Sequence, residues 1–243
     1  SYKNLYKKLN LLDFSENENI SKKNKVISYN IHYGSDFFEN EKIIEILKFL
    51  KNENANIYFL QEFPNIKFNN KLDLIHYFKK YLGIKNHYQK TIIKIGNIEY
   101  CSLILSRKKI EKIEILRFEN WLFRLPNFCI SIKINDLWYS NVHLNSDFTG
   151  LCQLYQAKEL VNYIHQLNES HFILGDFNSP KKYKSIQYLN SKLEICEDEN
   201  NTYPSILPMV KLDYCFNYKT NKKYNIKVKK LEYSDHYPLI LEL

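Results

Sequence analysis

The chain has 243 residues, of which 44% are hydrophobic and 15% aromatic, and it carries a formal charge of +8 from 35 basic and 27 acidic residues. This composition can build a sizeable core, and no apolar run approaches the length that spans a bilayer. The sequence holds only 5 glycines and 6 prolines, and no linker divides it. We therefore predict a polar lead-in over residues 1–24, without the apolar core of a signal peptide, and a single domain over residues 25–243.

Cysteine usage argues against a disulfide framework and against a zinc–thiolate site. The five cysteines are odd in number, widely spaced and free of Cys-x-x-Cys pairs. Most lie within apolar runs, where a free cysteine behaves as a small hydrophobe. This usage predicts a reducing, intracellular compartment such as the cytoplasm or the nucleus.

The positive charge favours a phosphate-rich partner, either nucleic acid or a phospholipid. Lysine, asparagine, isoleucine and tyrosine are all abundant, as is typical of an AT-rich genome whatever the function. The charge therefore agrees with a nucleic-acid substrate without establishing one. We expect the protein to act as a monomer.

Hydrophobic periodicity predicts helices alternating with strands at both ends of the chain and consecutive strands in between. Consecutive strands favour antiparallel pairing, which argues against a simple doubly wound fold. The Gly96-Asn97 pair is a plausible hairpin turn, and residues 194–201 read as an acidic loop. The predicted helices cover residues 39–51, 72–82, 151–167 and 182–193. The predicted strands cover residues 26–34, 57–64, 88–95, 98–106, 110–117, 127–134, 137–146, 172–176, 210–216 and 237–243.

The stretch Phe172 to Pro180 joins a buried strand to a pair of polar side chains. Its apolar run breaks at Gly175 and delivers Asp176 and Asn178, which would share one face of an extended segment. The structural alternative is a strand that ends in an Asx turn, where both side chains bond local backbone. A second strand-end carboxylate is Glu62, in the strand predicted over residues 57–64. We expect Pro64 to stop this strand.

Similar polar groups end or begin several other predicted strands. In isolation, each group has a structural explanation, such as a loop cap or a salt bridge. For the whole set, these structural explanations would have to hold at six separate places. Hard oxygen ligands and imidazoles without a thiolate suit Mg²⁺ or Mn²⁺, and such an ion suits phosphoryl chemistry. The set is Asn30, Glu62, His143, Asn145, Asp176, Asn178, Asp213, Asp235 and His236.

The order and local sequence of these groups resemble the endonuclease/exonuclease/phosphatase superfamily of DNase I-like proteins. The resemblance covers nearly all the chain and implies an α/β four-layer sandwich: two mixed β-sheets packed face to face, helices outside and an active site at one edge. The matching motifs, in order, are Asn30-Ile31-His32 with Gly34, Leu60-Gln61-Glu62, His143-Leu144, Gly175-Asp176-Phe177-Asn178, Leu212-Asp213-Tyr214 and Ser234-Asp235-His236.

The resemblance implies a role for each matched position. Glu62 is similar to the principal Mg²⁺ ligand, with Asn30 and Asp235 completing or supporting the site. Asp176 resembles the residue that orients or deprotonates the attacking water, and Asn178 the residue that helps to hold that water and the phosphate.

The same comparison extends to the imidazoles and their neighbours. His236 resembles the imidazole that contacts the phosphate, and Asp213 its orienting carboxylate. His143 resembles the imidazole that touches the phosphate or protonates the leaving oxygen. Asn145 and Arg124 are candidate substrate contacts, and a surface arginine is the simpler interpretation of Arg124.

The resemblance implies a Mg²⁺-dependent hydrolase acting on phosphoester bonds, and our first hypothesis for the substrate is nucleic acid. Abasic-site endonucleases differ at the first motif and at His143, whereas His143-Leu144 followed by Asn145-Ser146 is similar to the His-Leu-Glu-Ser of tyrosyl-DNA phosphodiesterases. A role in DNA-end processing or repair is therefore one version of this hypothesis. A phosphatase or phosphodiesterase on phosphoinositides or other small phosphoesters stays open, as does a non-catalytic binding module on the same fold.

Overall fold

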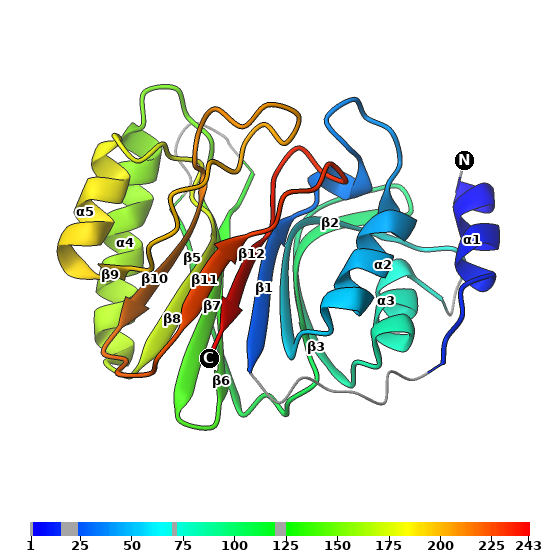
Figure 1. The fold of residues 1–243 in the computed structure, drawn as a ribbon, viewed down its shortest axis with the longest axis horizontal. Helices are drawn as coiled ribbons and strands as arrows, with labels where there is room; N and C mark the ends of the chain where they lie inside the picture. Colours follow the sequence, from blue (N-terminus) through cyan, green and yellow to red (C-terminus); the bar gives the residue numbers. More distant parts are fainter. Residues whose placement is uncertain (1, 16–23, 70–71, 120–124) are drawn as a thin grey trace.

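The computed structural model describes residues 2–15, 24–69, 72–119 and 125–243. Two mixed six-stranded sheets pack face to face with helices on their outer faces (Figure 1). The predicted four-layer α/β sandwich is confirmed. The described helices are α1 (Tyr2–Asn10), α2 (Ile43–Glu53), α3 (Leu74–Leu82), α4 (Leu151–Leu167) and α5 (Lys184–Lys192), with a short 3-10 helix η1 (His32–Gly34).

The two sheets differ in strand order but are built alike, with one central parallel pair in each. The first has the order β11-β12-β1-β2-β4-β3, and the second β5-β6-β7-β8-β10-β9. The parallel pairs are β1–β2 and β7–β8. The strands are β1 (Lys25–Asn30), β2 (Ile57–Ile66), β3 (Asn86–Ile95), β4 (Ile98–Ser106), β5 (Lys112–Arg117), β6 (Phe128–Ile134), β7 (Leu137–His143), β8 (His171–Asp176), β9 (Glu194–Ile195), β10 (Asp213–Tyr218), β11 (Asn225–Val228) and β12 (Leu239–Glu242).

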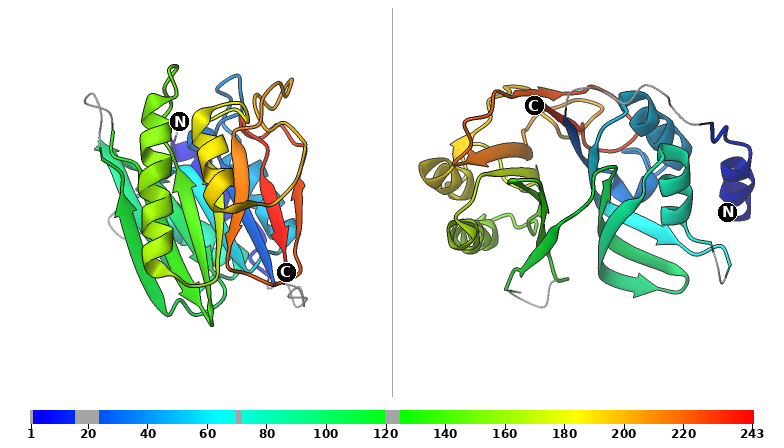
Figure 2. Two further views of the ribbon diagram at one scale, coloured as in Figure 1. Left: turned by 90° about the vertical axis from the view of Figure 1, so that its left-hand side faces the viewer. Right: turned by 90° about the horizontal axis from the view of Figure 1, so that it is seen from below.

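Three apolar layers hold this arrangement together. One lies between the first sheet and α1, α2 and α3; another lies between the sheets; the last lies between the second sheet and α4 and α5. Figure 2 shows the helices on opposite outer sides of the pair of sheets. Each central strand thus contributes alternate residues to an inner and an outer layer, as strand geometry requires.

That alternation brings the polar strand ends to one edge of the sandwich. In β1, Val26 lies in the inner layer, so Ser28 and Asn30 face the same way. In the second sheet, His143 of β7 is paired with Asp176 of β8, which is in turn paired with Asp213 of β10. Three neighbouring strands therefore present His143, Asp176 and Asp213 in one row.

The N-terminal part of the chain differs from the sequence-based expectation. Within the polar lead-in predicted over residues 1–24, α1 buries Leu5 and Leu9 in the outer layer of the first sheet. These leucines are four residues apart and so share one face of the helix. This helix was not predicted, and it packs on the domain core.

Other boundaries shift for local reasons. The predicted helix over residues 39–51 begins at Ile43, because Asp36 accepts hydrogen bonds from the backbone of Phe38 and Asn40 in a turn ahead of it. Strand β2 continues past Pro64 to Ile66. Its neighbour β1 ends at Asn30, opposite Gln61, so proline stands where β2 is paired on one side only. The short strands β9 and β11 were not predicted.

Gly175 interrupts the apolar run of the sequence but lies within the strand, which was predicted to continue through Asp176. Strand β8 runs through it to Asp176, and a Cβ at this glycine would lie 1.9 Å from the backbone oxygen of Val142. The glycine therefore permits the close approach of β8 to β7. Within the described part of the chain, no helix is long and apolar enough to cross a membrane.

We expect Gly175→Ala to lower the free energy of unfolding by about 3 kcal/mol or more, because the added methyl group meets rigid backbone. The matched control is Gly96→Ala in the β3–β4 hairpin, where a Cβ has open space around it and only the left-handed conformation opposes it. That cost is about 1–2 kcal/mol. Urea titration of both variants tests the prediction, and equal losses would contradict it.

Candidate active site

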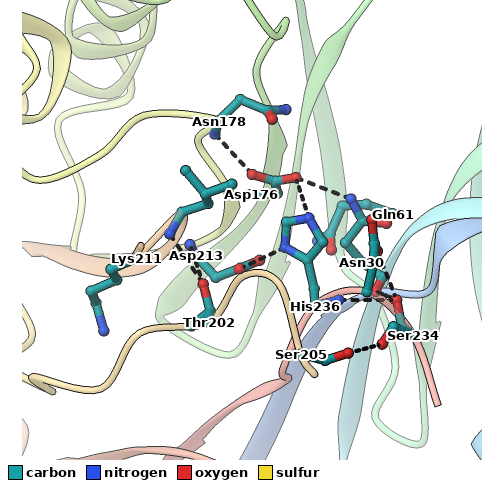
Figure 3. Close-up of polar contacts among 12 residues, drawn as sticks. Asn30, Gln61, Asp176, Asn178, Thr202, Ser205, Lys211, Asp213, Ser234 and His236 are labelled. Atoms are coloured by element: carbon teal, nitrogen blue, oxygen red, sulfur yellow. Dashed lines mark hydrogen bonds and ion pairs between the residues drawn. The ribbon is translucent and has the colours of Figure 1, made fainter. Parts of the chain in front are cut away.

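Five strands deliver polar side chains to the upper edge of the sandwich in Figure 1, and Figure 3 shows much of this cluster. At its centre, the side-chain amide of Asn30 donates to Glu62 Oε1 at 3.1 Å and to Asp176 Oδ2 at 3.0 Å. His143 Nε2 lies 3.7 Å from each of the same two oxygens. The two sheets therefore meet at a point where two carboxylates, an amide and an imidazole converge.

A β-bulge gives Glu62 its position. Between Leu60 and Phe63 the β2–β4 register shifts, so that two residues of β2 oppose one residue of β4. Glu62 also has a φ of 54°, outside the extended region. Gln61 keeps its place facing the other sheet, and the extra residue, Glu62, is turned to the site instead of to the outer helices.

His236 forms a buried pair with Asp213. His236 Nδ1 and Asp213 Oδ2 are 2.8 Å apart, and His236 Nε2 lies 3.7 Å from Asp176 Oδ2. Thr202 Oγ1 accepts the backbone N–H groups of Leu212 and Asp213, which fixes the start of β10. Asp213 therefore orients His236 towards Asp176.

The pair shares a proton. Burial would lower the pKa of His236, but the carboxylates of Asp213 and Asp176 raise it to about 10. Burial raises the pKa of Asp213, although the charge and hydrogen bond of His236 act in the opposite direction. Both shifts concern the same proton, which either the His236 imidazole or the Asp213 carboxyl group can hold. We assign it to His236, because the short contact is that of a charge-assisted hydrogen bond between imidazolium and carboxylate.

The loop ahead of β12 contacts the ends of β1 and β10 at the site. The Ser234 hydroxyl lies 2.7 Å from the backbone oxygen of Asn30, to which it donates, and 3.2 Å from Asp235 Oδ1. Asp235 Oδ1 is 3.9 Å from His32 Nδ1. Ser205 Oγ donates to the backbone oxygen of Ser234, which ties this loop to the one before β10. The loop thus carries Asp235 and His236 to the ends of β1 and β10.

Asn178 occupies a different position from the expected one. The strand ends at Asp176, and Asn178 has a φ of 47°, so the two side chains do not share a strand face. Its backbone N–H donates to Asp176 Oδ1 in the Asx-type bond that was the structural alternative, and its amide donates to the backbone oxygen of Leu144. Asn178 thus holds the Asp176 carboxylate and joins the loops after β7 and β8.

The structure does not bring every predicted residue to this cluster. Asn145 donates through its backbone N–H to Gln156 and through its amide to Cys152 Sγ, so its polar groups bind α4. Its substrate contact stays a prediction. Arg124 lies outside the described residues.

Sequence reasoning assigned no role to a set of buried polar groups just beneath the site. Gln61 Nε2 donates to Asn141 Oδ1 across the two sheets at 2.7 Å and to Ser28 Oγ at 3.1 Å. Asn141 in turn donates to Ser102 Oγ. Strand alternation was the sequence signal that could have indicated these groups. Ser28 stands two residues before Asn30, and Asn141 two residues before His143, so each faces the same side of its strand as a site residue.

The donor set suits a hard divalent cation. Among the described residues, Asp176, Asp213 and His236 offer ligand atoms within 4.8 Å of one another, but an ion there would have to displace the Asp213–His236 hydrogen bond. Glu62 provides a carboxylate on the opposite side of the cluster, with Asn30 beside it. Oxygen donors of this kind are those that Mg²⁺ and Mn²⁺ prefer.

Solved structures share this fold at low sequence identity. An endonuclease/exonuclease/phosphatase from Beutenbergia cavernae aligns with a TM-score of 0.72 and 12% identity, covering 91% of this chain and 71% of that one. The mannosyl-6-phosphatase Bt3783 of Bacteroides thetaiotaomicron aligns with a TM-score of 0.66 and 16% identity, covering 90% of this chain and 99% of that one. Truncated TDP2 of Caenorhabditis elegans aligns with a TM-score of 0.66 and 16% identity, covering 91% of this chain and 97% of that one.

We expect the Asp213–His236 pair to make stability depend on pH. Below about pH 6.5 the histidine is protonated in both folded and unfolded chains, so its contribution is fully present. Between about pH 6.5 and the native pKa of about 10, only the folded chain keeps this proton, and stability falls as the pH rises. The slope from this group approaches about 1.4 kcal/mol per pH unit.

Urea titrations in EDTA at several pH values test this expectation against Asp213→Asn, which removes the main partner of His236. The difference in unfolding free energy between wild type and variant should narrow from pH 6.5 to pH 10. Parallel curves would show that His236 does not hold a proton in the folded state.

Sequence comparison agrees with the structural similarity. A search of curated protein sequences gave no match. The family model described as Endonuclease/Exonuclease/phosphatase family matches residues 27–236, which include all nine strand-end and loop residues predicted for the site. This chain therefore belongs to the endonuclease/exonuclease/phosphatase family, whose members are hydrolases acting on phosphoesters.

Proposed function

We propose that this protein is a Mg²⁺-dependent phosphodiesterase that hydrolyses phosphoester bonds in nucleic acid. The observation that carries the proposal is the contact of one Asn30 amide with both Glu62 and Asp176, with His143 Nε2 3.7 Å from both carboxylates. Two carboxylates held this close repel one another unless positive charge lies beside them. A cation and a protonated imidazole are the two sources of charge available to such a site.

Glu62, Asn30 and Asp235 are the residues we assign to Mg²⁺. When bound, the ion would neutralise charge on the phosphate and on the oxygen that leaves. The bulge at Glu62 supports this assignment, because it turns a carboxylate to the site at the expense of regular pairing. Asp235 is joined to Asn30 through Ser234, whose hydroxyl contacts both residues.

The remaining groups provide proton transfer and orientation. Asp176, fixed by the Asn30 amide and by the backbone N–H of Asn178, orients and deprotonates the attacking water. His143 protonates the leaving oxygen or contacts the phosphate. His236, charged and oriented by Asp213, stabilises the negative charge that develops on the phosphoryl oxygens.

The charge distribution supports a polyanionic substrate. Besides the net charge of +8, a cleft of about 450 Å³ is lined by Lys181 and Lys182, by Asp198 and Glu199, and by Lys211, which is paired with Asp198. Lys181 and Lys182 are exposed and follow Asn178 by three and four residues. They are suited to contact phosphates on either side of the one that is cleaved.

A small phosphoester is the second candidate. It is favoured by the structural similarity to a mannosyl-6-phosphatase, which extends over 99% of that chain. A phosphoinositide or another small phosphoester would use the same residues in the same roles. The similarity to TDP2 supports a version of the first candidate in which the substrate is a DNA end.

We expect Glu62→Gln to reduce kcat/KM for nucleic-acid hydrolysis by at least about 10²-fold, because the amide keeps the shape of the side chain but loses its charge. EDTA should abolish turnover by the wild type. Glu45→Gln is the matched control, since Glu45 is exposed on α2.

A panel of plasmid DNA, single-stranded DNA, RNA, a 5′-tyrosyl oligonucleotide and a phosphoinositide should be assayed in Mg²⁺ with all three proteins. Activity of Glu62→Gln close to that of the wild type would refute the assigned role. Turnover of the phosphoinositide alone would support the second candidate.

Replacing Lys181 and Lys182 together by alanine should weaken binding of an oligonucleotide and flatten its salt dependence. Each lost phosphate contact reduces the slope of log K against log[salt] by about 0.7 for a single strand. The control is the double replacement of Lys222 and Lys223, which are exposed between β10 and β11. Fluorescence anisotropy at several salt concentrations measures both, and equal slopes for the two variants would contradict the proposed contacts.

A further inference from the structure

An apolar cleft of about 320 Å³ opens directly beside the catalytic groups. Glu62 and His143 form part of its lining, so whatever enters it lies next to the proposed reaction centre. Its size is at the lower end of the range of about 300–1,000 Å³ found for small-molecule sites. The other side chains that shape it include Tyr33, Ile93, Ile95, Tyr100, Leu125 and Asn127.

The cleft lies between the two sheets, on the side where β3 and β6 run. Leu125 and Asn127 precede β6 in the second sheet, whereas the isoleucines belong to β3 in the first. The β3–β4 register shifts between Thr91 and Ile93. This irregularity lets the consecutive residues Ile92 and Ile93 both line the cleft, where regular alternation would send one of them to the other face.

Several of the lining side chains are exposed although they are large and apolar. Ile95 is 59% exposed and Leu125 is 50% exposed. Tyr33 is 47% exposed and has a φ of 55°, a left-handed conformation that is unfavourable for a bulky residue. Its ring packs edge-on against Tyr100, with the centroids 5.2 Å apart. An exposed apolar cluster next to a polar site is typical of a binding surface.

The chemistry of the lining restricts the occupant. Among the described residues that line the cleft, none is a lysine or an arginine. The described lining residues therefore offer no cation to a second phosphate, and they offer the hydroxyl groups of a sugar few partners besides the Asn127 amide and the tyrosines. Tyrosine rings and isoleucine side chains instead suit a flat ring with a polar edge.

We propose that this cleft binds a planar aromatic ring that the substrate carries next to the scissile phosphate. The proposal rests on the phosphodiesterase function above, for which it specifies one part of the substrate. The ring could belong to the base of the adjoining nucleotide or to an aryl group esterified to the phosphate. Both present the same flat apolar surface, and the experiment distinguishes them.

The test compares Ile95→Glu, which puts a charge at the mouth of the cleft, with the wild type. The matched control is Ile113→Glu: Ile113 is 38% exposed and lies in β5 opposite Ile132, away from the end of β6 that borders the cleft. The substrates are four diesters of a base-free tetrahydrofuran 5′-phosphate, whose second ester group is thymidine, a second base-free tetrahydrofuran sugar, phenyl or methyl, so that only the second group can supply an aromatic ring. Comparing proteins on one substrate cancels differences in intrinsic reactivity.

We expect Ile95→Glu to lower kcat/KM at least tenfold for diesters whose second group carries the bound ring, and less than twofold for the methyl diester. A loss with the thymidine diester but not with the base-free one identifies a nucleobase, and a loss with the phenyl diester alone identifies an aryl ester. Ile113→Glu should leave all four values unchanged. Equal losses on all four diesters would overturn the proposal.

A binding measurement separates this proposal from the proposed catalysis. Isothermal titration calorimetry in Mg²⁺ should show at least tenfold tighter binding of phenyl phosphate than of methyl phosphate, and Ile95→Glu should remove the difference. This preference requires no turnover, so it would survive if the wild type hydrolysed none of the four diesters. Equal affinities, or no binding of either compound, would overturn the ring-binding cleft.

Discussion

The hydrogen bond between the buried amides of Gln61 and Asn141 is one of several buried polar contacts that set the distance across the sandwich. Gln61 Nε2 and Asn141 Oδ1 are 2.7 Å apart, and they belong to different sheets. The apolar layer around them is non-directional, so on its own it would tolerate sliding of one sheet over the other. Two amides buried in such a layer must keep their partner, since an unsatisfied one costs about 1–3 kcal/mol. Because each amide is followed within two residues by a site residue, Glu62 or His143, this bond also fixes the spacing between the two halves of the site.

Several of the irregular backbone segments lie at the edge that this bond supports. The bulge at Glu62 and the left-handed residues Tyr33 and Asn178 all border the site. Each conformation carries a cost that the surrounding packing must offset. The three apolar layers can do so because the strands beneath the edge pair regularly over most of their length. The regularly paired strands therefore stabilise the strained backbone conformations at the edge of the sandwich.

The parts of this structure that could be predicted follow from periodicity. The strand over residues 98–106 and the helix over residues 151–167 lie where predicted, because uninterrupted apolar patterns specify them. Convergence of the strand ends follows from the family resemblance and from strand alternation. The position of Glu62 depends on one extra residue in a ladder, and that of Asn178 on one left-handed φ, neither of which has a reliable sequence signal. Strands β9 and β11 have two and four residues, too few to show a period.

The order of strands arranges the surroundings of the site along a line. Across the second sheet, β6 borders the apolar cleft, β7 carries His143, β8 carries Asp176 and β10 carries Asp213. The lysine-lined cleft begins beyond β10, where Lys211 precedes Asp213 by two residues. A phosphate held between the imidazole and the carboxylates would then have apolar side chains on one side and the exposed Lys181 and Lys182 on the other. A nucleic-acid strand offers the matching sequence of groups, a base next to the cleaved phosphate and further phosphates beyond it, whereas a single sugar phosphate offers only the centre. The layout of charge and apolar surface therefore supports the proposal of a polymeric substrate in preference to a small phosphoester.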